Sequence, residues 1–340
     1  MKRLEALCFI LGGILFVALL RRFGIHPLME ALAGQGSRFL LILLPTAGSY
    51  LLVCLAWWLT LDPLERRDLT FPRLFLISMA GFSLNYITPF IALGGEPLKM
   101  AMLSRRVGRL RAISSVLAYN ALHVLSHLFV FVTACTMGFW LLRLSTVRIV
   151  TLAAGACVSA ALAAALLTCH ERGLAEHVLA FLRRIRVVRG SSERQKEWQD
   201  TLEKYDQSVR SFYRTRRRDF WVALGADYLG RSVWTFEIAI MIHNLGRTLD
   251  PLRAYFVHSI DSMMMVATFF VPYEMGVKEG AFCLILRWLG LDPSLGIYVG
   301  VVSRVREIIW IAAGLAIMAA LGVRRFPSLS RGPNLPEERG

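Results

Sequence analysis

The sequence of 340 residues lacks the short motifs by which many soluble enzymes are identified. It has no Walker phosphate loop, no Gly-x-Ser-x-Gly nucleophile motif and no glycine fingerprint for a dinucleotide. Its six cysteines stand singly, without a Cys-x-x-Cys pair, so we interpret them as small apolar side chains. These absences exclude ATP-driven transport and familiar hydrolase chemistry, and we expect no cofactor.

Acidic residues are also scarce, since 24 Asp and Glu stand against 39 Lys and Arg, which gives a formal net charge of +15. The basic residues occur in short clusters between apolar segments, without the aromatic-interleaved basic face of a nucleic-acid-binding protein. We therefore expect no nucleic-acid partner. His123 and His127 lie four residues apart, but no His-Glu-x-x-His arrangement contains them, so we expect no metal site.

Apolar residues are abundant, at 56% of the sequence and a mean hydropathy of +0.52. Six apolar runs are long enough to cross a hydrocarbon core of about 30 Å, which takes about 20 helical residues. They are 4–21, 38–60, 112–142, 147–168, 219–244 and 294–321. The sequence therefore predicts an all-α integral membrane protein. We expect the first run to be a retained helix, because no small-residue cleavage site follows it.

Two further regions, 71–103 and 253–288, are too long for one membrane helix and too short for two full crossings. Each carries proline and glycine near its middle. A helix broken at membrane depth frees backbone groups that lipid cannot satisfy, so the break must be covered by protein or by a water-filled cavity. We predict that both regions are re-entrant hairpins that face the protein interior, giving eight membrane segments in all.

The basic clusters predict which end of the molecule is cytoplasmic. Residues 169–219 hold 13 Lys or Arg against eight Asp or Glu, which places this segment inside by the positive-inside rule. Counting segments from it puts both chain ends inside and the two hairpins in opposite orientations. We therefore predict an inverted repeat with halves 1–145 and 146–322, a helical insert at 169–218 and a cytoplasmic tail at 323–340.

The first hairpin carries a compact polar group. Its candidate substrate-binding residues are Asn85, Gly94, Gly95, Glu96 and Lys99. Glu96 and Lys99 are three residues apart, so they can share one helical face. Gly94 and Gly95 would present free N–H groups at a helix start, where an anionic headgroup could dock.

The second hairpin is denser in charge, because Glu274, Lys278 and Glu279 lie in an apolar region with Asp261 upstream. Each unpaired charge at the membrane centre costs roughly 2.5–3.5 kcal/mol on insertion scales. Glu274 and Lys278, four residues apart, could form an internal ion pair that only locks the hairpin. We favour a substrate path, because intramembrane charges usually mark one.

Two spans add further polar faces. Arg304 is our first candidate to bind a phosphate, because a guanidinium stays charged when desolvated and binds phosphate with two nitrogens. Glu307 lies three residues further on, and Arg306 points to a different face. Asp227 and Arg231 could equally satisfy each other at a spacing of four. We keep Asp227, Arg231, Asp261 and Glu307 as accessory candidates.

Two motifs resemble one known family. They are Asn85-x3-Pro89 followed by Gly95-Glu96-x-x-Lys99, and Pro272-x3-Gly276-x-x-Glu279. Over roughly 1–322 the chain resembles the lysylphosphatidylglycerol synthase transmembrane region, or flippase-like family, which includes the membrane half of the multiple peptide resistance factors. The resemblance implies lipid handling at the hairpins in a bacterial cytoplasmic membrane. No aminoacyltransferase domain is expected after Gly340, so we expect no lysylphosphatidylglycerol synthesis.

We therefore expect a translocator of a polar-headgroup lipid, such as a phospholipid, aminoacyl-phospholipid, hopanoid or polyprenyl-phosphate lipid, and not an enzyme. One alternative is an intramembrane lipid-modifying enzyme of the polyprenyl-diphosphate phosphatase kind, although its Pro-Gly-x-Ser-Arg-Ser loop is missing here. The other is a structural subunit of an envelope-lipid complex. The expected partner is membrane lipid, with a lipid-biosynthesis enzyme as a second candidate.

Overall fold

The computed structural model describes residues 29, 33–34, 36–87, 95–142, 145–172, 215–268, 271, 274 and 276–321. Three predicted features fall outside these residues. They are the first span at 4–21, most of the cytoplasmic insert and the tail at 323–340.

The described residues form helices joined by short turns, without a strand among them. A short 3-10 helix, η1 (Gly36–Arg38), comes first. The α-helices are α3 (Phe39–Thr60), α4 (Pro63–Asp68), α5 (Phe71–Ile87), α6 (Gly95–Val107), α7 (Arg109–Leu141), α8 (Thr146–Arg172), α11 (Arg217–Val233), α12 (Thr235–Asn244), α13 (Pro251–Ala267), α14 (Val277–Trp288) and α15 (Ser294–Ala320). The prediction of an all-α membrane protein is confirmed.

Three helical stretches among the described residues are both long and apolar enough to cross a membrane. They are Gly36–Thr60, Arg111–Leu141 and Thr146–Thr168. The helix α15 is as long as α8 but carries three charged residues near its middle. The total number of spans therefore stays a prediction.

One predicted span is divided in two. We expected a single helix over 219–244, but α11 ends at Val233 and α12 begins at Thr235. At the break the Trp234 N–H donates to the carbonyl of Arg231, three residues back, instead of to the residue four back. This tighter turn interrupts the helix at a residue that is neither proline nor glycine, the residues by which we located the other breaks.

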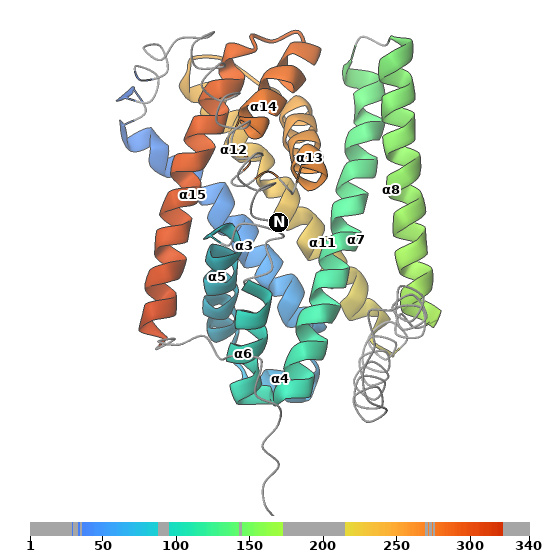
Figure 1. Ribbon diagram of the computed structural model, residues 1–340, viewed down its shortest axis with the longest axis vertical. Coiled ribbons are helices and arrows are strands. Elements are labelled where there is room, and N and C mark those ends of the chain that lie inside the picture. Colours follow the sequence, from blue (N-terminus) through green and yellow to red (C-terminus); the bar gives the residue numbers. More distant parts are fainter. Residues whose placement is uncertain are drawn as a thin grey trace, which may run out of the picture.

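Both predicted hairpin regions contain a pair of helices, α5 with α6 and α13 with α14. Figure 1 shows α5 and α6 in one half of the molecule and α13 and α14 in the other. The helix α15 packs against α5 as well as α14, so it connects the two hairpins. The inverted repeat and its division near residue 145 stay predictions.

Two apolar clusters are stacked along the long helices, with polar residues between them. One cluster joins α12, α13 and α14 to the end of α7 and the start of α15. The other joins α5 and α6 to the end of α3 and the start of α7 and of α11. The buried polar residues at the boundary include Thr46, Asp227, Glu237 and Arg306. The fold thus holds a polar layer between two apolar cores.

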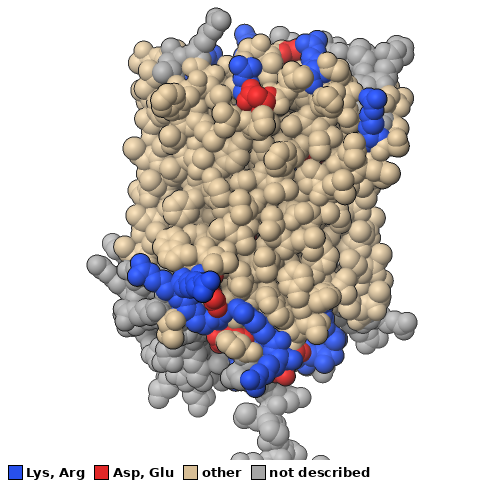
Figure 2. All heavy atoms as spheres, turned by 180° about the vertical axis from the view of Figure 1, so that it is seen from behind, with Lys and Arg blue, Asp and Glu red and all other residues tan. Residues whose placement is uncertain are grey.

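The outer surface has the pattern of a protein embedded in lipid. Figure 2 shows a broad belt without Lys, Arg, Asp or Glu, and charged residues gathered at both ends of the molecule. Basic residues are densest at the lower end, where α4 lies and α7 begins. The basic residues of these and the adjoining helix ends include Arg66, Arg67, Arg105, Arg106, Arg109, Arg111, Arg216, Arg217 and Arg218.

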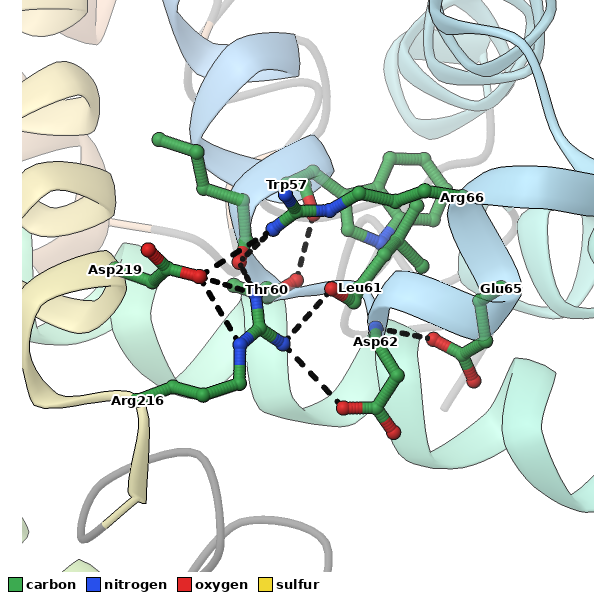
Figure 3. A network of polar contacts seen from close by, with 9 residues as sticks. Trp57, Thr60, Leu61, Asp62, Glu65, Arg66, Arg216 and Asp219 are labelled. Carbon is green, nitrogen blue, oxygen red and sulfur yellow. Dashed lines mark hydrogen bonds and ion pairs between the residues drawn. The ribbon is translucent and has the colours of Figure 1, made fainter.

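A polar network at this end closes α3 against α11 (Figure 3). Arg216 donates from its two terminal nitrogens to the carbonyls of Leu61 and Leu59, at 2.8 and 2.9 Å, and binds Asp219 at 2.6 Å. Arg66 also donates to the Leu59 carbonyl, at 2.9 Å. Because the last carbonyls of a helix have no partner within it, these two arginines satisfy the end of α3.

The short helix α4 begins beside this network, with Pro63 at its first position and a hydrogen bond of 2.9 Å from the Asp62 N–H to Glu65. Burial raises the pKa of the Glu65 carboxyl, although this hydrogen bond acts in the opposite direction. The network is a structural clamp that holds the start of α11 to the end of α3.

Candidate functional site

A cavity of about 140 Å³ opens where the two hairpin regions approach each other. Tyr86, from the end of α5, lines one side, and Glu274 and Lys278 of the second hairpin line another. Arg306 and Glu307 of α15 complete a charged wall. The cavity therefore lies between elements far apart in the sequence, at the level of the polar layer.

Two buried ion pairs form the charged wall of the cavity. Lys278 binds Glu307, and Arg306 lies 3.0 Å from the Glu237 carboxylate. The other oxygen of Glu237 accepts a hydrogen bond of 3.0 Å from Thr46. Each cation is thus held by a carboxylate from another helix, which offsets the cost of burying both charges. The internal Glu274–Lys278 pair that we considered does not form, because Lys278 turns to α15 instead.

A third pair fixes the start of α14. Glu279 is fully buried and accepts hydrogen bonds from the Gly276 N–H at 2.9 Å and from Arg304 at 2.5 Å. Arg304 also reaches the backbone carbonyl of Glu274, at 3.1 Å. Gly276 has a positive φ of 77°, a conformation that glycine adopts without strain. Arg304, our candidate for a phosphate, therefore holds the hairpin turn in this conformation.

The first hairpin contains a separate polar cluster centred on Glu96. One carboxylate oxygen accepts from Lys99 at 2.8 Å and from Asn85 at 3.3 Å, and the other accepts from Asn120 of α7 at 2.8 Å. The Gly95 N–H, which we expected to be free for an anionic headgroup, donates to Asn85 at 2.6 Å. Gly94 lies outside the described residues. The Gly95 N–H at the start of α6 is thus already bonded to a side chain of the protein.

Lys99 is only 1% exposed and is enclosed by aromatic rings. Its ammonium lies 4.7 Å from the centre of the Phe82 ring, 5.8 Å from that of Trp57 and 6.0 Å from that of Tyr119. A cation over ring faces gains electrostatic stabilisation. Gly81 leaves the space for the lysine stem, since a Cβ there would approach Lys99 Cε to 2.5 Å. Lys99 is thereby positioned as a buried cation of the hairpin.

A third cluster joins α7 and α11. Asp227 binds Arg231 at 3.2 Å and His123 at 2.8 Å. Asp227 and Arg231 thus satisfy each other, which was the alternative that we kept open from their spacing of four residues. Arg231 also contacts His123 at 2.6 Å and His127 at 3.0 Å. His127 in turn lies 2.7 Å from the hydroxyl of Ser262, which lines the cavity. This cluster therefore extends the polar layer from the cavity toward the first hairpin.

The tertiary structure brings the predicted residues into three places. Asp261, Glu274, Lys278 and Glu307 line the cavity, with Glu279 and Arg304 beside it. Asn85, Gly95, Glu96 and Lys99 form the cluster of the first hairpin. Asp227 and Arg231 lie in the third cluster.

Sequence reasoning missed several of the partners. Glu237 and Arg306 form the most buried ion pair of the cavity, and both are charges inside apolar runs. That rarity was the signal that could have identified Glu237. Nothing in the sequence indicated that Asn120 contacts Glu96, because a single asparagine in a helix can have many roles. His123 and His127 were weighed only as metal ligands, and the described residues contain no group of three or more His, Cys, Asp or Glu arranged to hold a metal.

Comparison with known proteins adds one finding. Neither the curated proteins nor the solved structures gave a significant match. Residues 6–316 match the family described as the lysylphosphatidylglycerol synthase TM region. This match covers most of the chain, including both hairpin regions, so the family resemblance of the two motifs is confirmed. The chain belongs to the lysylphosphatidylglycerol synthase TM region family, and its function is related to membrane lipid.

Proposed function

We propose that this protein moves a polar-headgroup lipid between the two leaflets of a membrane, and that it is a translocator without catalytic activity of its own. The observation that carries the proposal is the charged cavity in the polar layer, lined by both hairpin regions. Transporters with inverted repeats bind their substrates near the bilayer midplane, between the repeats. The headgroup would enter this layer while the acyl chains stay in lipid.

The size of the cavity supports an alternating mechanism. Ligand pockets commonly have volumes of about 300–1,000 Å³, whereas this cavity has a volume of about 140 Å³. A lipid headgroup would therefore need the hairpins to separate. Ion pairs between helices, such as Lys278 with Glu307 and Arg304 with Glu279, could open and close as that happens. This conformation would then be one in which the path is closed.

The surface charge supports an orientation. The end that carries α4 and the start of α7 is rich in arginine and would face the cytoplasm by the positive-inside rule. The first hairpin would then enter from the cytoplasmic side and the second from the outside. A bacterial cytoplasmic membrane with both chain ends inside is the location that we propose.

The experiment uses the full-length protein in liposomes that contain fluorescent lipids with different headgroups. Dithionite destroys the fluorophores of the outer leaflet, so the loss of fluorescence beyond half reports movement from the inner leaflet. We expect acceleration for at least one headgroup, and its loss in Arg306→Ala but not in Arg105→Ala, at the surface of α6. Lipid movement no faster than in protein-free liposomes, for every headgroup, would refute the proposal.

One observation favours an enzyme as the second candidate. The Ser262 hydroxyl lies 2.7 Å from His127 Nε2 and lines the cavity, which is the arrangement of a nucleophile with its base. Arg231 also donates to this nitrogen, at 3.0 Å, and thereby weakens it as a base.

Ser262→Ala separates the two functions. For a translocator we expect lipid movement within about fivefold of the wild type, because one hydrogen bond of the cavity is worth about 1 kcal/mol. For an enzyme the same substitution would abolish product formation, measured as released phosphate or altered lipid by mass spectrometry. Release of phosphate by the wild type would select the enzyme.

A further inference from the structure

Asp261 of α13 is a buried carboxyl group without a complete set of partners. It is 7% exposed and lines the cavity. Its Oδ1 has no hydrogen-bond partner among the residues that the structure describes. Since buried polar atoms are nearly always hydrogen-bonded, this oxygen points to a ligand that the protein binds in the cavity.

The surrounding cations are already engaged by other carboxylates. Lys278 binds Glu307, Arg306 binds Glu237, and Arg304 binds Glu279. Glu274 also lines the cavity, and within the described part of the chain no ion pair reaches its carboxylate. The charged and titratable groups around Asp261 come from several elements. They are Lys278 and Glu279 of α14, Arg306 and Glu307 of α15, Glu274 between α13 and α14, Glu237 of α12, Tyr86 of α5, His258 of α13 itself, and Arg231 and His127 beyond Ser262.

Four carboxyl groups therefore share the cavity with two cations, Lys278 and Arg306. The carboxyl groups are those of Glu237, Asp261, Glu274 and Glu307. An ionised carboxylate without a partner is costly at this depth, and two neighbouring carboxyl groups resist being ionised together. One bound proton removes the charge of Asp261 and gives it an O–H group that can donate a hydrogen bond to a neighbouring oxygen. A proton is the smallest ligand that satisfies this site, and it requires no additional space in the cavity.

We propose that Asp261 binds and releases the proton that drives lipid movement, with Glu274 as the second carboxyl group of the site. This inference rests on the proposed translocation. When the cavity faces the more acidic side, Asp261 takes up one proton and the cavity loses one negative charge. After access changes to the other side, the O–H bond breaks, the proton leaves, and the carboxylate is restored. The only bond made and broken is this O–H bond.

Proton binding is tested without any lipid assay. Infrared difference spectra of the purified full-length protein at successive pH values detect the C=O stretch of a protonated carboxyl group. We expect a band that disappears on raising the pH in the wild type, is absent in Asp261→Asn and persists in Asp68→Asn, at an exposed position of α4. A spectrum of Asp261→Asn identical to that of the wild type would overturn the inference.

Coupling is tested in liposomes with an imposed pH gradient. Coupling to one proton would shift the steady-state distribution of the transported lipid by about tenfold for each pH unit, because one unit corresponds to a tenfold ratio. We expect Asp261→Asn to lose this response, and Asp261→Glu to retain it, which also controls for misfolding. Wild-type lipid movement that is unchanged by the gradient would refute the coupling.

The two proposals fail in different ways. If no lipid moves under any gradient but the infrared band depends on Asp261, translocation is wrong and the proton site stands. If lipid moves but the band does not depend on Asp261, translocation stands and the proton site is wrong.

Discussion

At the scale of single residues, the buried charges are arranged in pairs whose members come from different helices. Arg306 and Glu237 are 4% and 3% exposed, and they join α15 to α12. Glu279 joins α14 to α15 through Arg304. Removing one member of such a pair leaves the other as an uncompensated buried charge, so these residues bear on the stability of the protein.

The Arg306–Glu237 pair gives the first prediction. Arg306→Ala leaves the Glu237 carboxylate buried without its cation, and we expect it to destabilise the protein by about 3–5 kcal/mol. The double variant Arg306→Leu with Glu237→Leu should regain most of this loss, because the unpaired charge is gone. Thermal unfolding in detergent measures both, with Arg105→Ala as the surface control. If Arg306→Ala is as stable as Arg105→Ala, the Arg306–Glu237 pair does not contribute to the stability of the protein.

The cluster around Glu96 gives the second prediction. Glu96→Gln leaves Lys99, 1% exposed, with a neutral partner, so we expect reduced stability and slower lipid movement. Adding Lys99→Met removes the unpaired cation and should restore stability. Lipid movement restored together with stability would mean that the pair is structural, whereas movement that stays lost would assign Lys99 to the transport path. Unfolding curves and the liposome assay on the same samples distinguish these results.

At the scale of elements, proline and glycine marked the division of each predicted hairpin region into two helices, but they did not mark the division of 219–244 into α11 and α12. Glycine also decides how closely the elements pack. A Cβ at Gly314 of α15 would lie 1.8 Å from Ser83 Oγ and 2.7 Å from the Met79 carbonyl of α5. The contact between α15 and the first hairpin therefore depends on the absence of one methyl group.

The third prediction follows from this contact. Gly314→Ala should push α15 away from α5 and destabilise the protein by about 1–3 kcal/mol, the usual cost of overpacking. Gly225→Ala is the matched control, because nothing lies within 4 Å of the added Cβ on α11 and alanine favours a helix. Thermal unfolding of the two variants should therefore change in opposite directions. Equal stability of the two variants would contradict the tight packing.

At the scale of the whole molecule, two apolar cores enclose a polar layer, and the surface charge differs between the two ends. The polar layer bears on the proposed translocation in either orientation, whereas the surface charge indicates which end is cytoplasmic. Orientation is therefore the property on which the direction of transport depends.

The fourth prediction concerns this orientation. In a variant without the six native cysteines, we introduce Arg67→Cys on α4 or Arg247→Cys near the opposite end. A membrane-impermeant maleimide added to intact cells should label the Arg247→Cys variant and not the Arg67→Cys variant. After the cells are lysed, both variants should be labelled. Labelling of Arg67→Cys in intact cells would reverse the proposed orientation and the side from which each hairpin enters.

The sequence by itself determined the membrane class, the family and the two regions in which a helix is broken into a pair. These depend on local properties, namely long apolar runs and the inability of proline and glycine to continue a helix. Only the tertiary structure decided the partners of the charges. Lys278 binds Glu307 rather than Glu274, and Arg306 binds Glu237, because helix packing and not sequence spacing sets which side chains meet. Asp261 was a candidate from the sequence, but only that arrangement showed that its Oδ1 lacks a partner among the described residues.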